Sequence, residues 1–206
     1  MRDLQTLERH PTAQKLVDVV IEMMVENPYD NIKSETVLER SGISRGPLYY
    51  HFVDFQELIE TAQIQIYQAY ATRISQALTD LIASCKDSEN LKAGFAIFVN
   101  QIAGEATVKS RLQLIGIVQR AYSIDGFRRK FLPLQEEINL SWIELYRFCL
   151  DRGWADSTIE PRAFAVVMQS TMFGRVLNNI SHEKLELNVL MGFIPKLFNK
   201  FCFSNL

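Results

Sequence analysis

The chain has 206 residues, enough for one or two domains, and its 48% hydrophobic and 22% charged residues are typical of a globular protein. Residues 16–25 form the most apolar stretch but contain Asp18 and Glu22, so we expect neither a signal peptide nor a membrane span and predict a cytoplasmic protein. The three cysteines have the spacing of neither a disulfide framework nor a zinc site. A phosphate loop, a nucleophile elbow and a placed catalytic triad are all missing from the sequence, so we expect no enzyme, no metal and no cofactor.

Apolar residues recur at helical spacing along almost the whole chain, and no stretch alternates at period two, so the sequence predicts an all-α fold. Three short helices come first. One begins near Thr12 and is ended by Asn27-Pro28, and the second, over residues 34–40, is ended by Ser41-Gly42. Ser44 caps the third, which continues to about Phe52.

A long fourth helix is predicted from Asp54, which forms a capping box with Glu57, to about Ala83. We expect its inward stripe at Ile59, Ala62, Ile66, Ala69 or Tyr70, Ile74, Ala77 and Leu81. Further helices are predicted over residues 91–103, 108–122, 127–152, 161–180 and from about 184 to 203. Residues 86–89 and residues 123–126 are predicted as two of the loops between the helices. The domain boundary is predicted at the start of the long helix, which divides the chain into residues 1–53 and 54–206.

Residues 34–52 have the features of a helix-turn-helix, in which a tight turn joins two short helices. Gly42 suits a left-handed turn conformation, and Ser44 directs the start of the second helix outward. Leu48 and Phe52, four residues apart, are the better core pair of that helix. Its remaining face then lies outside and consists of Arg45, Gly46, Pro47, Tyr49, Tyr50 and His51.

Such a surface suits the major groove of DNA. Arg45 can reach guanine edges or a phosphate, Gly46 permits close approach, and Pro47 can touch a thymine methyl group. The hydroxyls of Tyr49 and Tyr50 and the ring of His51 can hold the phosphate backbone. The alternative for the three aromatic residues is packing against the fourth helix. Sequence spacing gives His51 no close partner and places His10 and His182 alone on loops.

The segment Ser-Gly-Ile-Ser-Arg-Gly-Pro-Leu-Tyr-Tyr-His-Phe, followed by Glu57-Leu58, resembles the recognition-helix signature of the TetR family. That resemblance implies an N-terminal helix-turn-helix DNA-binding domain and a C-terminal domain for effector binding and dimerisation. It implies DNA contacts at Ser34, Arg45, Gly46, Pro47, Tyr49, Tyr50 and His51. Two positions differ from the family pattern: Leu38, where the family usually has a small residue, and Phe55, where it usually has a phosphate-binding lysine.

The C-terminal domain carries bulky side chains close to amides, which suggests an effector pocket. We predict its lining as Phe95, Phe98, Leu112, Ile115, Trp142, Tyr146 and Met168, with orienting groups from Asn100, Gln101, Gln119 and Gln169. An ordinary core is the alternative for most of these residues. The last two helices carry apolar residues on more than one face, which predicts a dimer interface through Phe164, Phe173, Leu177, Leu190, Phe193 and Leu197, unless the monomer buries them itself.

The sequence therefore favours a homodimeric TetR-type repressor that a small-molecule effector releases from a double-stranded DNA operator. One observation supports a different class of function. Residues 1–60 hold six Lys and Arg against eleven Asp and Glu, a net charge of −5 in a chain of net charge −2. DNA-binding segments are usually basic. The alternative is a helical dimer that keeps the helix-turn-helix shape and acts through a protein partner.

Overall fold

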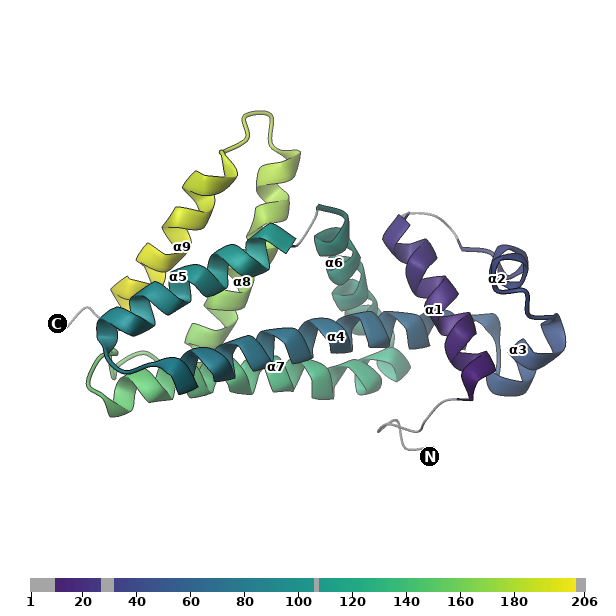
Figure 1. Ribbon diagram of the computed structural model, residues 1–206, viewed down its shortest axis with the longest axis horizontal. Coiled ribbons are helices and arrows are strands. Elements are labelled where there is room, and N and C mark those ends of the chain that lie inside the picture. Colours follow the sequence, from purple (N-terminus) through teal and green to yellow (C-terminus); the bar gives the residue numbers. More distant parts are fainter. Residues whose placement is uncertain (1–9, 27–31, 106–107, 203–206) are drawn as a thin grey trace. The chain divides into compact units, whose positions relative to one another are not determined.

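The computed structural model describes residues 10–26, 32–105 and 108–202, and these residues form helices and no strand (Figure 1). The predicted all-α fold is confirmed. The helices are α1 (Pro11–Glu26), α2 (Ser34–Ser41), α3 (Arg45–His51), α4 (Phe55–Ser84), α5 (Ser88–Glu105), α6 (Val108–Ser123), α7 (Asp125–Asp151), α8 (Pro161–Ile180) and α9 (Leu187–Cys202).

Two of the predicted loops differ from the structure. The loop expected over residues 123–126 is wrong, because Ile124 alone separates α6 from α7. The amide of Ile124 donates to Arg120 O at 3.0 Å, and its carbonyl accepts from Arg128 N at 2.9 Å, so helical hydrogen bonding continues on both sides. The other loop, expected over residues 86–89, is shorter, since α5 already begins at Ser88.

The chain divides into two compact units, and the division falls inside α4. The first unit contains the described residues up to Ala69 together with Leu112–Pro133. The second contains Tyr70–Arg111 and the described residues from Leu134 onward. The described part of residues 1–53 therefore lies in one unit, which also takes residues from α4, α6 and α7.

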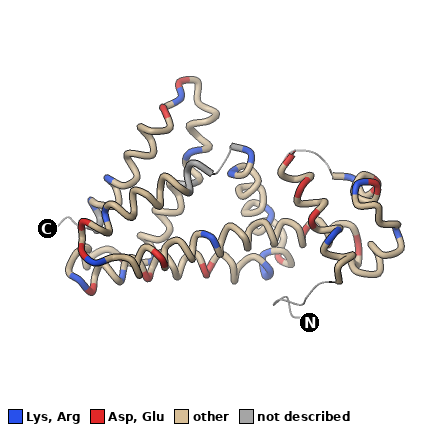
Figure 2. The backbone as a smooth tube through the Cα atoms, viewed as in Figure 1, with Lys and Arg blue, Asp and Glu red and all other residues tan. Residues whose placement is uncertain are grey.

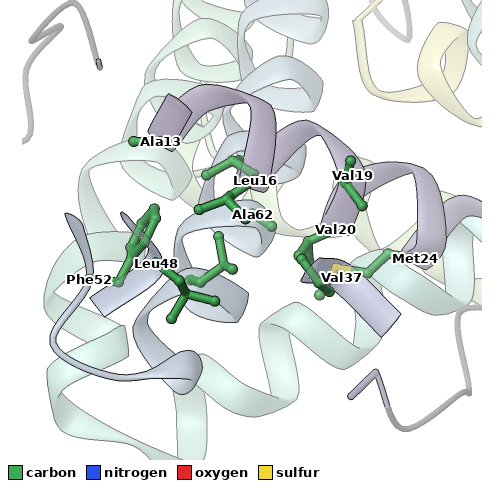
Figure 3. Close-up of a cluster of buried hydrophobic side chains, with 11 residues drawn as sticks. Ala13, Leu16, Val19, Val20, Met24, Val37, Leu48, Phe52 and Ala62 are labelled. Atoms are coloured by element: carbon green, nitrogen blue, oxygen red, sulfur yellow. The ribbon is translucent and has the colours of Figure 1, made fainter. Parts of the chain in front are cut away.

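The core of the first unit packs α1 against the short helices that follow it (Figure 3). Its buried residues are Ala13, Leu16, Val17, Val19, Val20, Met24, Val37, Leu48, Phe52, Leu58 and Ala62. Full burial of one such aliphatic side chain contributes about 1.5–3 kcal/mol to stability. This cluster fixes α2 and α3 on α1, so the turn between them is held by packing on both sides.

The buried face of α4 is turned slightly from the predicted one. Its buried residues are Leu58, Ala62, Tyr67, Ala71, Ile74, Leu78 and Leu81. Ile59 and Ile66, expected in the inward stripe, are only partly buried at the edge of the cluster. Both stripes have helical spacing, and the packing partners decide between them. Tyr67 shows this, since its ring lies 4.4 Å from that of Phe131 in α7.

The core of the second unit is aromatic and draws on four helices. Phe95 of α5 stacks on Phe198 of α9 with ring centroids 3.7 Å apart. The edge of Trp142 in α7 meets Phe164 of α8 at 6.2 Å, and Tyr146 stacks on the same Phe164 at 4.4 Å. All five rings are at most 4% exposed.

Candidate nucleic-acid interface

The turn between α2 and α3 depends on Gly42. Its φ of 66° lies in the left-handed region, and its amide donates to Glu39 O at 3.3 Å to close α2. A Cβ added there would meet nothing within 4 Å, so glycine is required by the backbone conformation and not by space. Ser41 completes the turn, because its hydroxyl donates to Leu38 O at 3.2 Å and accepts from Ile43 N at 3.2 Å.

The ends of α3 and the start of α4 follow the predicted caps with one exception. Ser44 lies at the N-cap of α3 in extended conformation, but its side chain makes no capping hydrogen bond. Asp54 accepts from Glu57 N at 2.7 Å, and the Glu57 carboxylate accepts from Val53 N at 2.7 Å. The first bond is that of the predicted capping box, whereas the second goes to the amide before the N-cap; together they set where α4 begins.

Helix α3 has two sharply different faces. Leu48 is fully buried and Phe52, which follows the helix, is 7% exposed, whereas Tyr49 is 51% and Tyr50 is 83% exposed. The predicted core pair is therefore confirmed, and the alternative in which the tyrosines pack on α4 is wrong. Neighbouring aromatic side chains that are exposed in this way are typical of interaction surfaces.

Three more of the expected DNA contacts surround this face. Arg45 is exposed and lies 3.2 Å from Glu35, an exposed ion pair of little net stability that a phosphate can replace. Gly46 is also exposed, and a Cβ added to it would meet nothing within 4 Å, so the protein's own packing does not require glycine there. Pro47 is half-buried in the first turn of the helix.

Ser34 is the first residue of α2 and is half-buried. Its hydroxyl hydrogen-bonds the Glu35 carboxylate, which also accepts a hydrogen bond from its own backbone. The backbone bond first, and then the Ser34 bond and the nearby Arg45, lower the pKa of Glu35. The first turn of α2 thus carries the Glu35 carboxylate, which is readily ionised, directly beside Arg45.

His51 has a ring partner that sequence spacing did not reveal. Its imidazole stacks on that of His10, with centroids 4.9 Å apart and planes 27° from parallel. Tyr50 approaches the same ring edge-on at 5.0 Å. The interpretation of His10 and His51 as isolated residues is therefore wrong, because α1 brings His10 to the end of α3.

Acidic residues mark α1, as the red segments along it in Figure 2 show. Asp18, Glu22 and Glu26 lie on this helix, and Glu26 binds Arg40 of α2 at 2.7 Å. Hydrogen bonding to Glu26 is the main reason that the pKa of Arg40 is raised. The negative charge of this segment is thus partly neutralised by α2.

No family model matches the sequence, and no curated protein matches it. Solved structures do match over nearly the whole chain. NemR of Escherichia coli in its reduced form has a TM-score of 0.68 at 14% identity, covering 95% of this chain and 100% of its own. The fatty acid degradation regulator FadR of Bacillus halodurans has a TM-score of 0.66 at 16% identity, covering 94% and 97%. A protein described as a TetR-family transcriptional regulator, from Mesorhizobium loti, has a TM-score of 0.66 at 15% identity, covering 90% and 92%.

The chain has the TetR fold. In this fold α2 and α3 are the helix-turn-helix, and the second unit carries five of the seven residues predicted to line an effector pocket. The structure brings Phe95, Phe98 and Trp142 together, with Phe98 5.7 Å from Phe95 and 5.8 Å from Trp142. Tyr146 and Met168 are buried in the same unit. Leu112 and Ile115 are half-buried and belong to the first unit.

The amides expected to orient an effector do not support that role. Asn100, Gln101 and Gln119 are exposed to solvent. Gln169 is part-buried but satisfied, since it accepts from Gln135 at 2.9 Å and donates to Asn139 at 2.9 Å. The Tyr146 hydroxyl likewise donates to Asp156 O at 2.8 Å. None of these four amides is therefore a buried group that still needs a hydrogen-bond partner.

Two buried arginines of the second unit were missed by sequence reasoning. Arg111 of α6 is 6% exposed and Arg175 of α8 is 4% exposed. Burial lowers the pKa of both guanidinium groups, and the charge of Arg111 lowers that of Arg175 further. Neither residue occurs in a motif, so the sequence holds no signal that distinguishes them from solvated arginines.

The six residues predicted for a dimer interface separate into three groups. Leu177 is 66% and Phe193 is 59% exposed, and Phe173, Leu190 and Leu197 are half-buried. The prediction is wrong for Phe164. Its side chain is 2% exposed among the core rings, so it provides no surface for a partner. Further exposed apolar residues on and between the last two helices are Val166, Val167, Ile180, Leu185, Leu187 and Val189.

The described part of the chain shows neither a metal site nor a membrane span. Among those residues no group of three or more His, Cys, Asp or Glu side chains is arranged to hold a metal ion. None of the helices formed by those residues combines the length and apolar character needed to cross a bilayer.

Proposed function

We propose that this chain is a TetR-type transcriptional regulator, a homodimer that binds operator DNA through α2 and α3 and is released by a small-molecule effector. Its activity is then binding rather than catalysis. One observation carries the proposal: α3 buries Leu48 and exposes Tyr49, Tyr50 and Arg45 on its other side. The similarity of the fold to that of proteins described as regulators supports it.

Operator binding would use the exposed face of α3 in the major groove. Arg45 exchanges Glu35 for guanine or phosphate, Gly46 lets the backbone come close, and the hydroxyls of Tyr49 and Tyr50 bind phosphates. Two copies of α3 in a dimer would occupy successive major grooves, about 34–36 Å apart along the DNA. A regulator bound in this way represses by occupying the promoter.

Release would follow from a change in that spacing. An effector weakens DNA binding only to the extent that it binds one conformation of the dimer more tightly than the other. The second unit is the proposed site, because it contains the aromatic set of Phe95, Phe98 and Trp142. Apolar or amphipathic compounds fit such an interior. Trp142 fluorescence provides a direct probe for them.

The test begins with selection of duplex DNA from a random library by the purified protein, followed by anisotropy titrations over a range of salt. We expect an enriched, near-palindromic sequence whose affinity falls steeply as salt rises. Tyr50→Ala should weaken binding by about tenfold, the effect of losing a contact of about 1.4 kcal/mol.

Tyr122→Ala is the matched control. Tyr122 is 82% exposed, against 83% for Tyr50, but lies on α6. Its replacement should leave the affinity unchanged. If no duplex is enriched, the proposal is wrong, and the acidic net charge of residues 1–60 then favours a protein partner. Equal effects of the two replacements would show that α3 does not contact DNA.

A further inference from the structure

The stacked pair of His10 and His51 connects the start of α1 to the end of α3. The rings overlap at a centroid distance of 4.9 Å, with 27° between their planes. Both residues belong to the first unit. His51 is the last residue of α3 and borders Tyr50. The position of its ring therefore shapes one end of the surface of α3 that is proposed to contact DNA.

His10 is anchored by the backbone of α1. Its Nδ1 accepts a hydrogen bond from Thr12 N at 3.3 Å, and its carbonyl accepts from Gln14 N at 3.1 Å. In the neutral ring the proton therefore resides on Nε2. The helix itself is fixed by Ala13 and Leu16, which are 6% and 0% exposed. His10 is thus tied to the start of a packed helix, although its own side chain is exposed.

His51 is covered on two sides by neighbouring rings. One face of its imidazole lies on His10, and Tyr50 meets it edge-on at 5.0 Å with the planes 82° apart. A side chain that already has its bound orientation loses less conformational entropy when it binds. The stack restricts the imidazole of His51 before any phosphate arrives.

We propose that His10 is a positioning residue for DNA binding, which acts by stacking on His51 and holding its imidazole ready for a backbone phosphate. This role rests on the proposed function, because it presumes that His51 contacts DNA. It assigns to α1 a part in recognition that its buried residues alone do not have. His10 acts through His51, so an apolar ring in its place should retain most of the effect.

The first experiment measures the affinity of three variants for the duplex selected by the unmodified protein. His10→Ala removes the ring and should weaken binding by about fivefold, whereas His10→Phe keeps a stacking surface and should bind within about twofold of the unmodified chain. His182→Ala, an exposed histidine between α8 and α9, is the matched control and should have no effect. Circular dichroism melts establish that each variant is folded.

The second experiment reads the stack directly in the DNA-free protein by NMR. The chain has three histidines, so single replacements assign every imidazole resonance. His10→Ala should shift the ring protons of His51 through loss of the ring current, and His182→Ala should not. Unshifted His51 resonances would overturn the inference.

The DNA measurements distinguish a failure of the positioning role of His10 from a failure of the proposed DNA-binding function. If the unmodified protein binds DNA and His10→Ala binds equally well, only the positioning role is wrong. A loss of affinity in His10→Phe as large as that in His10→Ala also contradicts it, since stacking would then not be the property that matters. If the unmodified protein binds no DNA, the proposed function fails and takes this role with it.

Discussion

The guanidinium of Arg162 binds the carboxylate of Glu136 through two hydrogen bonds, Nη1 to Oε1 at 2.8 Å and Nη2 to Oε2 at 2.9 Å. Asn139 adds a third, from Nδ2 to Oε2 at 3.1 Å. These bonds, those of Arg162 first, lower the pKa of Glu136 to about 2. The pair joins α7 to α8 within the second unit.

The lowered pKa predicts a defined pH dependence of stability. The ordinary pKa of 4.5 stands for the unfolded chain, and the folded value is about 2. The stabilisation is therefore fully present above pH 4.5 and is lost as the pH falls toward 2. Because both side chains are about half exposed, solvent screening keeps the effect small.

Denaturant unfolding of the unmodified chain and of Glu136→Gln across that range checks this prediction. The unmodified chain should lose stability more steeply with acid than the variant. Glu137→Gln replaces the adjacent exposed carboxylate and should behave as the unmodified chain does. Parallel acid dependence in all three proteins would mean that the Arg162 pair does not persist in solution.

Gly46→Ala should separate folding from DNA binding. An added Cβ meets nothing within 4 Å, and alanine favours a helix over glycine by about 0.5–1 kcal/mol, so the variant should be at least as stable as the unmodified chain. Its DNA affinity should nevertheless fall, since the methyl group occupies space that a close DNA backbone needs. Thermal melts and anisotropy titrations measure the two effects, and an undiminished affinity would place DNA away from Gly46.

A lysine at position 55 should destabilise the protein, although the family pattern places a phosphate-binding lysine there. Phe55 is half-buried and packs against the core cluster of the first unit. Losing that contact should cost about 1–3 kcal/mol in the free energy of unfolding.

Val53→Lys is the control for that charge. Val53 is 86% exposed just after α3, so the same cation is added there without loss of packing. Its unfolding free energy should stay within about 0.5 kcal/mol of the original. Equal stability of Phe55→Lys and Val53→Lys in denaturant unfolding would contradict the role of Phe55 in the core.

The elements predicted best from the sequence depend on residues close together in the chain. Gly42 and the pair of Asp54 and Glu57 act within a few residues, so their chemistry specifies a turn and a cap before any packing is known. The Leu48 and Phe52 pair was predicted for the same reason, since one helical turn separates them. Because that pair marks the buried face of α3, it also predicted which face of the helix is exposed.

Features that depend on tertiary packing could not be predicted from the sequence. His10 lies just before α1 and His51 is the last residue of α3, and nothing local to either residue indicates the stack. Phe164 and Phe193 both fit apolar stripes at helical spacing, yet one is 2% and the other 59% exposed. A stripe shows that a face is apolar, but not whether it is covered by the same chain or by another.

The exposed apolar residues of α8 and α9 lead to a prediction about the dimer. Leu177 and Phe193 are the most exposed of the predicted interface residues, so charges placed there should leave the subunit's own core intact. A double variant, Leu177→Glu with Phe193→Glu, would bury two carboxylates in the interface without partners, which is strongly unfavourable. We expect a folded monomer with much weaker operator binding, because two linked half-sites are no longer engaged together.

Size-exclusion chromatography with light scattering measures the mass of the unmodified chain and of the double variant, and circular dichroism establishes that both are folded. Leu132→Glu provides the control, since Leu132 is 52% exposed but lies on α7 in the first unit. This control should remain a dimer, because a new charge on a solvent-facing surface disturbs little. A monomeric unmodified chain would contradict the homodimer itself. A double variant that remains dimeric would move the interface away from Leu177 and Phe193, because two buried unpaired carboxylates are not compatible with a close-packed contact at those positions.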